Sequence, residues 1–139
     1  MKALTLTQPW ATLVALGEKA IETRSWYTPF RGEIAIHAAM GFPGWAKRLC
    51  FEEPFSIVLS KHGLSPDNLP LGRILCTVSL EDCIETRSLN PDYPSEQERA
   101  FGDFSYGRFA WLLAGPLQTF DPAPYVKGHL GLWNWEERA

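Results

Sequence analysis

The stretch that decides how this chain folds is residues 17–26, which read GEKAIETRSW. Gly17 follows a short apolar run, and a glycine in that place is typical of the left-handed residue that ends a helix. The residues after it predict a strand with Glu22 and Arg24 on one face. We expect these two side chains to form a charged pair near Lys19, which lies at the turn. An ordinary surface strand, whose ion pair contributes about 0–1 kcal/mol, fits the same pattern.

The rest of the chain alternates short strands with a few helices. Pro9 favours the first turn of a helix that ends before Gly17. Residues 41–62 predict a second helical region, interrupted near Pro54. The stretch Ser95-Glu96-Gln97-Glu98 resembles a capping box that starts a short helix. The predicted strands are residues 2–6, 20–24, 32–38, 72–84, 106–113, 117–120 and 131–135.

Five to seven strands, with helices inserted between the early ones, predict an α+β fold around an open, mixed β-barrel. A chain of 139 residues has the length of a single domain, here residues 1–139. Such a domain buries roughly two-thirds of the surface of its unfolded chain. The hydrophobic content of 45% and the charged content of 21% are those of an ordinary globular protein.

Residue content disfavours several classes of protein. No window approaches the roughly 18 uncharged apolar residues that a membrane span requires, and the polar start, residues 1–5, does not resemble a signal peptide. The three cysteines form no Cys-x-x-Cys pair and the three histidines are scattered, so we expect no metal site and no cofactor. These features predict a cytoplasmic protein with reduced, structural thiols.

The net charge of −3 is unevenly distributed along the chain. Residues 1–50 carry six Lys or Arg against three Glu, a net of +3. Residues 51–139 carry seven Lys or Arg against thirteen Asp or Glu, a net of −6. An acidic protein is not expected to coat nucleic acid non-specifically. The positive first third nevertheless allows a local basic site there.

Aromatic side chains are abundant near the charged stretch. The six tryptophans include Trp10 and Trp26, and an indole beside Lys or Arg suits stacking on a nucleobase, which contributes about 1–3 kcal/mol per base. Tryptophan also fills cores when its N–H has a partner, and this is the interpretation that we favour for Trp111. We likewise expect Trp45 and Phe55 in the core.

Several motifs together resemble the ASCH domain family, over essentially the whole chain. They are residues 7–11 (TQPWA), 17–19 (GEK), 21–26 (IETRSW), 31–33 (RGE), 36–38 (IHA), 101–103 (FGD), 106–111 (YGRFAW) and 127–133 (KGHLGLW). The resemblance implies a PUA-like β-barrel with a cleft lined by Gln8, Lys19, Glu22, Arg24 and His37. It also implies binding of RNA or another nucleic acid, with amidohydrolase activity on N4-acetylcytidine in some members and ribonuclease activity in others.

A binding module for RNA or a modified nucleoside is the function that we predict first. The side chains expected to contact phosphate, a base edge or a base face are Lys19, Arg24, Arg31, Trp10 and Trp26. Glu22 would orient Arg24 or accept a hydrogen bond from an exocyclic amine. His37, at the end of a strand, is a candidate acid or base in the pocket, although a lone histidine on a strand is more often structural.

A metal-free amidohydrolase acting on N4-acetylcytidine is the alternative. The family's amidohydrolases use a lysine, a threonine and a glutamate. Lys19 matches the lysine, whereas Glu22 stands at the position of the threonine and Thr23 follows it. In this hypothesis Lys19 is the base or nucleophile and Glu22 moves protons. A third hypothesis is a protein-interaction barrel whose acidic residues 51–139 meet a basic partner.

Overall fold

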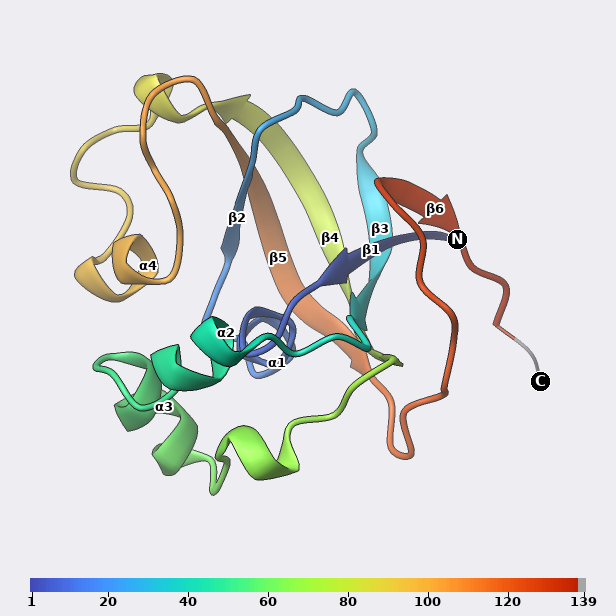
Figure 1. Cartoon of the computed structure of the whole chain (residues 1–139). Coiled ribbons are helices and arrows are strands. Elements are labelled where there is room, and N and C mark those ends of the chain that lie inside the picture. Colours follow the sequence, from blue (N-terminus) through green and yellow to red (C-terminus); the bar gives the residue numbers. More distant parts are fainter. Residues whose placement is uncertain (138–139) are drawn as a thin grey trace.

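The computed structural model describes residues 1–137 (Figure 1). Its strands are β1 (Lys2–Leu6), β2 (Ile21–Arg24), β3 (Gly32–Ala38), β4 (Arg73–Glu85), β5 (Phe109–Thr119) and β6 (Leu132–Asn134). Its α-helices are α1 (Trp10–Ala15), α2 (Gly44–Leu49), α3 (Phe55–Lys61) and α4 (Glu96–Ala100), with 3-10 turns at Pro66–Asn68 and Thr86–Ser88. The strands predicted at 106–113 and 117–120 are joined in one, β5. The predicted interruption of the helical region near Pro54 is confirmed, because α2 ends and α3 begins around it.

The six strands of the described chain form one sheet in the order β2-β5-β4-β3-β1-β6. Strands β1 and β3 are parallel, and the other neighbouring pairs are antiparallel. The register shifts between Ile36 and His37 in β3 and twice along β4, and such bulges bend and twist a strand. The sheet curls into a half-barrel (Figure 1). The predicted α+β barrel of five to seven strands, with short helices between the early strands, is confirmed.

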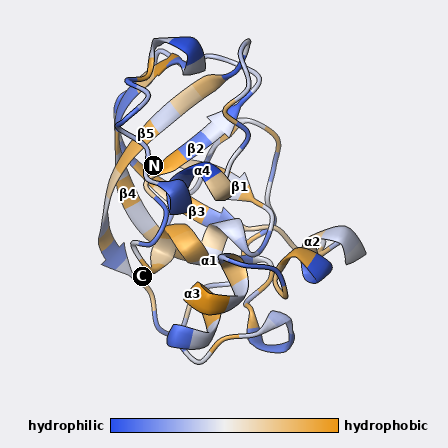
Figure 2. Cartoon of the chain, turned by 90° about the vertical axis from the view of Figure 1, so that its left-hand side faces the viewer, coloured by the Kyte–Doolittle hydropathy of each residue, from blue (hydrophilic) through white to orange (hydrophobic). Residues whose placement is uncertain are grey.

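Helix α1 fills the curl of the sheet, where it contacts β1, β3, β4 and β5. Its residues Ala11 and Val14 belong to the main core cluster, together with Leu4, Ile36 and Trp111. Trp111 is fully buried, as predicted. Figure 2 shows apolar residues concentrated on α1 and α3 and interspersed with polar ones along the strands.

A second core cluster joins α3 and the segment after α4 to helix α1. Leu13 of α1 packs in it with Phe55 and Leu59 of α3 and with Phe101, which follows α4. The cluster brings together segments that are up to 88 residues apart, from Leu13 to Phe101. The segment after α4 also contacts the edge strand β2, where the N–H of Asp103 donates to Oγ1 of Thr23 at 3.2 Å.

The turn between α1 and β2 has the conformation predicted from Gly17. This residue has a φ of +75°, in the left-handed region that glycine adopts without strain. The backbone N–H groups of Glu18 and Lys19 both donate to the Leu13 carbonyl, at 3.0 and 3.1 Å. These bonds end the helix and lead the chain directly into β2, which pairs with β5.

Candidate functional site

A cavity of about 500 Å³ opens between β2, the end of β1, helices α2 and α3 and the segment that follows α4. We call it the Glu22 cavity. Its polar lining includes Thr5, Thr7, Glu22, Thr23, Arg24, Asp103 and Arg108, and its aromatic lining includes Trp10, Trp45 and Phe55. Of the residues predicted from the sequence, the cavity thus brings together Trp10, Glu22, Thr23 and Arg24.

The charged pair predicted on β2 is present in this cavity. Buried and half-buried residues alternate along β2, with Glu22 and Arg24 at the half-buried positions. Nη1 of Arg24 donates to Oε2 of Glu22 at 3.2 Å. Oε1 of Glu22 lies 3.7 Å from Nζ of Lys19. The Glu22 carboxylate is therefore held between two cationic groups.

Lys19 lies behind the cavity and does not line it. Its side chain is 0% exposed, and its Nζ donates to the carbonyl of Ile21. Its second acidic neighbour is Glu98, whose Oε2 lies 3.8 Å from Nζ. A buried cation needs acceptors and opposite charge because water does not solvate it. Lys19 is thus a buried positive anchor for Glu22.

Glu98 reaches this cluster because of how helix α4 begins. Oγ of Ser95 accepts a hydrogen bond from the N–H of Glu98 at 3.0 Å, as in the predicted capping box. The Glu98 carboxylate, however, accepts from the N–H of Ala20 at 2.7 Å and faces Lys19. The spacing of Ser95 and Glu98 predicts a helix start but does not indicate Lys19 as a partner, so Glu98 could not be predicted as a site residue from the sequence.

A second guanidinium, that of Arg108, lines the cavity next to Asp103. Nη2 of Arg108 donates to the Thr23 carbonyl at 3.1 Å, and Oγ1 of Thr23 accepts from the N–H of Asp103 at 3.2 Å. Nε of Arg108 lies 3.5 Å from Oδ2 of Asp103 and has no hydrogen-bond partner in the described chain. Hydrogen bonds from Ser105 lower the pKa of Asp103. This Nε atom is buried, whereas the Arg108 side chain as a whole is 28% exposed and lines the cavity.

Besides its charged and polar residues, the cavity is lined by aromatic side chains. The rings of Trp10 and Trp45 lie 5.8 Å apart at 46°, and Trp10 meets Phe55 edge-on at 6.0 Å. Nε1 of Trp10 donates to the Phe101 carbonyl at 2.7 Å, which fixes the indole. Trp45 is 56% exposed, so its predicted place in the core is wrong. The short helix α2 lies at the surface and buries Ala46 instead.

Gln8, predicted to line the cleft, is fully buried and is not among the lining residues of the Glu22 cavity. Its side-chain amide donates to Oγ1 of Thr12 at 2.7 Å and to the Pro70 carbonyl at 2.8 Å. Its amide oxygen accepts from the N–H of Thr12 at 2.9 Å. Because both ends of the amide are engaged, Gln8 joins α1 to the segment before β4.

Trp26 and Arg31 also lie outside the lining of the Glu22 cavity. Trp26 packs edge-on against Trp111, with ring centroids 4.8 Å apart, and the Arg24 guanidinium lies 5.7 Å from its ring. Arg31 pairs with Asp82 at 3.2 Å and donates to nearby backbone carbonyls. Trp26 therefore supports Arg24 from outside the cavity, and Arg31 braces the loop before β3.

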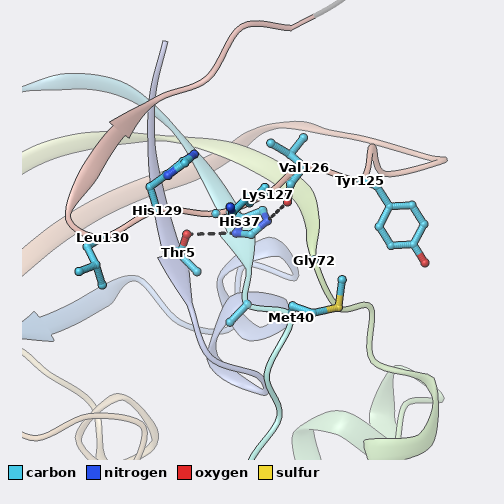
Figure 3. Close-up of a pocket in the computed structure, with 11 residues that line it drawn as sticks. Thr5, His37, Met40, Gly72, Tyr125, Val126, Lys127, His129 and Leu130 are labelled. Atoms are coloured by element: carbon cyan, nitrogen blue, oxygen red, sulfur yellow. Dashed lines mark hydrogen bonds between the residues drawn. The ribbon is translucent and has the colours of Figure 1, made fainter.

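His37 is buried and lies at a different cavity, shown in Figure 3. Its Nε2 donates to the Val126 carbonyl at 2.7 Å, and its Nδ1 lies 3.0 Å from Oγ1 of Thr5. That hydroxyl also accepts from Nε1 of Trp133 at 3.0 Å, and it can donate to Nδ1 when the imidazole is neutral with its proton on Nε2. Burial lowers the pKa of His37, opposed by its backbone hydrogen bonds.

Within residues 1–137, no cluster of His, Cys, Asp and Glu side chains has the arrangement of a metal site. The cysteines Cys50, Cys76 and Cys83 are buried and free, and burial raises the pKa of Cys76 to about 12. None of the helices in the described chain is long and apolar enough to cross a membrane.

The fold and the site define a small α+β domain with a charged, aromatic-walled pocket at the edge of a curled sheet. Residues 4–111 match the model of the ASCH domain, and the chain belongs to the ASCH domain family. It is 27% identical over 135 residues to activating signal cointegrator 1 of Homo sapiens and to that of Mus musculus. The match covers 97% of this chain and 22% of each relative, so the chain spans about a fifth of their length.

The solved structures that match this chain include a mutant of the ZmASCH protein from Zymomonas mobilis. It shares 16% sequence identity with this chain at a TM-score of 0.46. The superposition covers 84% of this chain and 70% of the other.

Proposed function

We propose that the domain binds a nucleobase of RNA, or a nucleoside, in the Glu22 cavity. The observation that carries this proposal is a carboxylate, held between Lys19 and Arg24, in one cavity with the indoles of Trp10 and Trp45. Aromatic faces bind bases by stacking, and Arg or Lys side chains bind phosphate or base oxygens. The family resemblance to nucleic-acid-binding domains supports the same function.

The position of Glu22 argues for a base with an exocyclic amine. An ionised carboxylate only accepts hydrogen bonds, and Glu or Asp accepts from the amino group of cytosine in known recognition patterns. A carbonyl in the same place, as in uracil, would face the carboxylate without a proton between them. Arg24 and Arg108 supply donors for the oxygens of the same nucleotide. Cytidine is thus the expected ligand over uridine.

The variant Glu22→Gln tests this proposal. Its amide can still accept a hydrogen bond but carries no charge, and it can also donate to a carbonyl. We expect wild-type protein to bind cytidine at least tenfold more tightly than uridine, and the variant to lose about tenfold in cytidine affinity. The affinities are measured by quenching of tryptophan fluorescence, with titration calorimetry as a second readout.

The matched control is Glu33→Gln, because Glu33 is an exposed carboxylate on β3 that does not line the cavity. It should bind cytidine as the wild type does. Thermal unfolding of both variants separates lost binding from lost folding. Equal cytidine affinity in Glu22→Gln and wild type would contradict the role of Glu22, and absence of binding to any nucleoside or short RNA would overturn the proposal.

Hydrolysis of N4-acetylcytidine is the second candidate function. It is favoured by the 3.7 Å approach of Lys19 to Glu22 at the back of the cavity and by Thr23 in its lining. The reaction would require Nζ of Lys19 to leave the Ile21 carbonyl and enter the cavity, since its side chain is 0% exposed. Chromatography of N4-acetylcytidine incubated with wild type and with Lys19→Ala tests this function. Cytidine released by the wild type and not by the variant would support it.

A further inference from the structure

A second cavity, of about 630 Å³, shares Thr5 of strand β1 with the Glu22 cavity. Figure 3 shows it between the end of β3 and the segment of residues 125–130. We call it the Lys127 cavity. It has Thr5 and His37 at its base and Met40, Tyr125, Lys127 and His129 around it. Neither the predicted site nor the proposed base-binding site uses these last four residues.

The wall of the Lys127 cavity is held firmly to the sheet. The Val126 N–H donates to the Gly72 carbonyl at 3.0 Å, and the Val126 carbonyl accepts from His37. At Gly128 a Cβ atom would lie 2.7 Å from the His37 ring and 2.9 Å from Oγ1 of Thr5. The backbone therefore approaches the ring as closely as only glycine allows. The cavity is preformed, so a ligand does not have to order this segment.

The side chains around the Lys127 cavity suit an anion joined to a planar group. No acidic residue is among its lining residues, and Lys127 has no ion pair within the described chain. Tyr125 is 68% exposed, and the Arg73 guanidinium lies 3.6 Å from its ring centroid. A lysine ammonium binds phosphate as a point charge, and an exposed tyrosine ring is a surface on which a base can stack.

The two cavities adjoin each other at the end of β1. Thr5 lines both of them. Leu6, in the lining of the Glu22 cavity, accepts a hydrogen bond at its carbonyl from the N–H of Ala39 at 2.9 Å, and Ala39 lines the Lys127 cavity. A ligand that occupies the first cavity and continues past Thr5 therefore arrives at the second.

We infer that the Lys127 cavity binds the nucleotide next to the base held in the Glu22 cavity, with Lys127 on its phosphate, so that the ligand is single-stranded RNA of at least two nucleotides. This inference rests on the proposed function. It adds that a free nucleoside fills only half of the site. Tyr125 stacks on the second base, which a stacking contact accepts with little regard to its identity.

The test compares cytidine with a cytidylate hexamer in titrations of wild type, Lys127→Glu and Tyr125→Ala. We expect the wild type to bind the hexamer at least tenfold more tightly than cytidine. Both variants should lose about tenfold in hexamer affinity and keep wild-type affinity for cytidine. In Lys127→Gln, the slope of log affinity against log salt should fall by about 0.7, as for one lost phosphate contact on a single strand.

The matched control is Lys61→Glu, which makes the same change of charge at a lysine whose partner, Glu18, lines neither cavity. It should leave hexamer affinity within about twofold of wild type. Unchanged hexamer affinity in both Lys127→Glu and Tyr125→Ala would overturn the inference while cytidine binding upholds the proposed function. Failure of the wild type to bind either cytidine or the hexamer would overturn both.

Discussion

Lys19 and Glu98 form a buried ion pair that no local sequence pattern indicates. The Lys19 side chain is 0% exposed and that of Glu98 is 11% exposed. Removing one member of a buried ion pair is costly because the other charge stays buried without compensation. Since Lys19 also lies 3.7 Å from Glu22, the carboxylate in the cavity is positioned by a residue that does not line it.

The variant Glu98→Gln should therefore be markedly less stable. It keeps an oxygen that can accept from the Ala20 N–H but removes the negative charge 3.8 Å from Lys19. We expect the free energy of unfolding, measured in urea, to fall by about 1–3 kcal/mol, because Lys19 loses one of its two carboxylate neighbours and keeps Glu22 at 3.7 Å. Glu96→Gln, at an exposed position of the same helix, is the control and should change it by less than about 0.5 kcal/mol. Equal stabilities of the two variants would contradict the importance of this pair.

Among the elements, helix α4 contributes to the site although it is only five residues long. A helix of that length is not stable by its own propensity. It is held by the Ser95 cap and by a hydrogen bond of 3.2 Å from the Gln97 amide to the Glu18 carbonyl. The residue after it, Phe101, packs in the second core cluster. These contacts fasten α4 to the turn that leads into β2.

Substitution of the cap tests this arrangement at the level of the element. Ser95→Ala removes the acceptor for the Glu98 N–H, so we expect a loss of about 1 kcal/mol in the free energy of unfolding. Hydrogen exchange at the amides of Glu98 and Ala20 should accelerate together. Ser60→Ala, on the exposed side of α3, serves as the control. Faster exchange at Glu98 with unchanged exchange at Ala20 would show that the cap and β2 are independent.

At the scale of the whole molecule, His37 joins parts of the chain that are distant in sequence. Its ring connects β3 to Thr5 on β1 and to Val126 in the 125–130 segment. Trp133 of β6 contacts the same ring edge-on at 5.4 Å. A neutral imidazole with its proton on Nε2 satisfies all of these contacts, because Nε2 donates to the Val126 carbonyl and Nδ1 can accept from the Thr5 hydroxyl.

Stability should consequently depend on pH through His37. Burial lowers the pKa of His37 below the value of about 6.5 that it has in an unfolded chain. The unfolded state therefore takes up the proton first as the pH falls. The free energy of unfolding should be fully retained above about pH 6.5 and decline as the pH falls from there towards the folded-state pKa.

Urea unfolding at a series of pH values, from about 7.5, one unit above the unfolded-state pKa of histidine, down to about 5, measures this effect. The variant His37→Gln keeps a donor and an acceptor but does not titrate. It should be less stable overall, with a smaller decline over this range than the wild type. The lowered pKa of Glu18, caused by hydrogen bonds from Lys61 and His62, acts at lower pH, below about 4.5. Parallel pH profiles of variant and wild type would exclude His37 as the source.

The sequence alone determined the local features of this protein: the helix end at Gly17, most strand positions, the Glu22–Arg24 pair and the family resemblance. Backbone sterics and the two-residue period of a strand decide such features within a few residues. Which of the predicted site residues share a cavity depends instead on the three-dimensional packing of the chain. It buried Gln8 and His37, placed Lys19 opposite Glu98, and left Trp45 exposed beside Trp10. Those outcomes depend on packing between segments far apart in the chain, which no local pattern records.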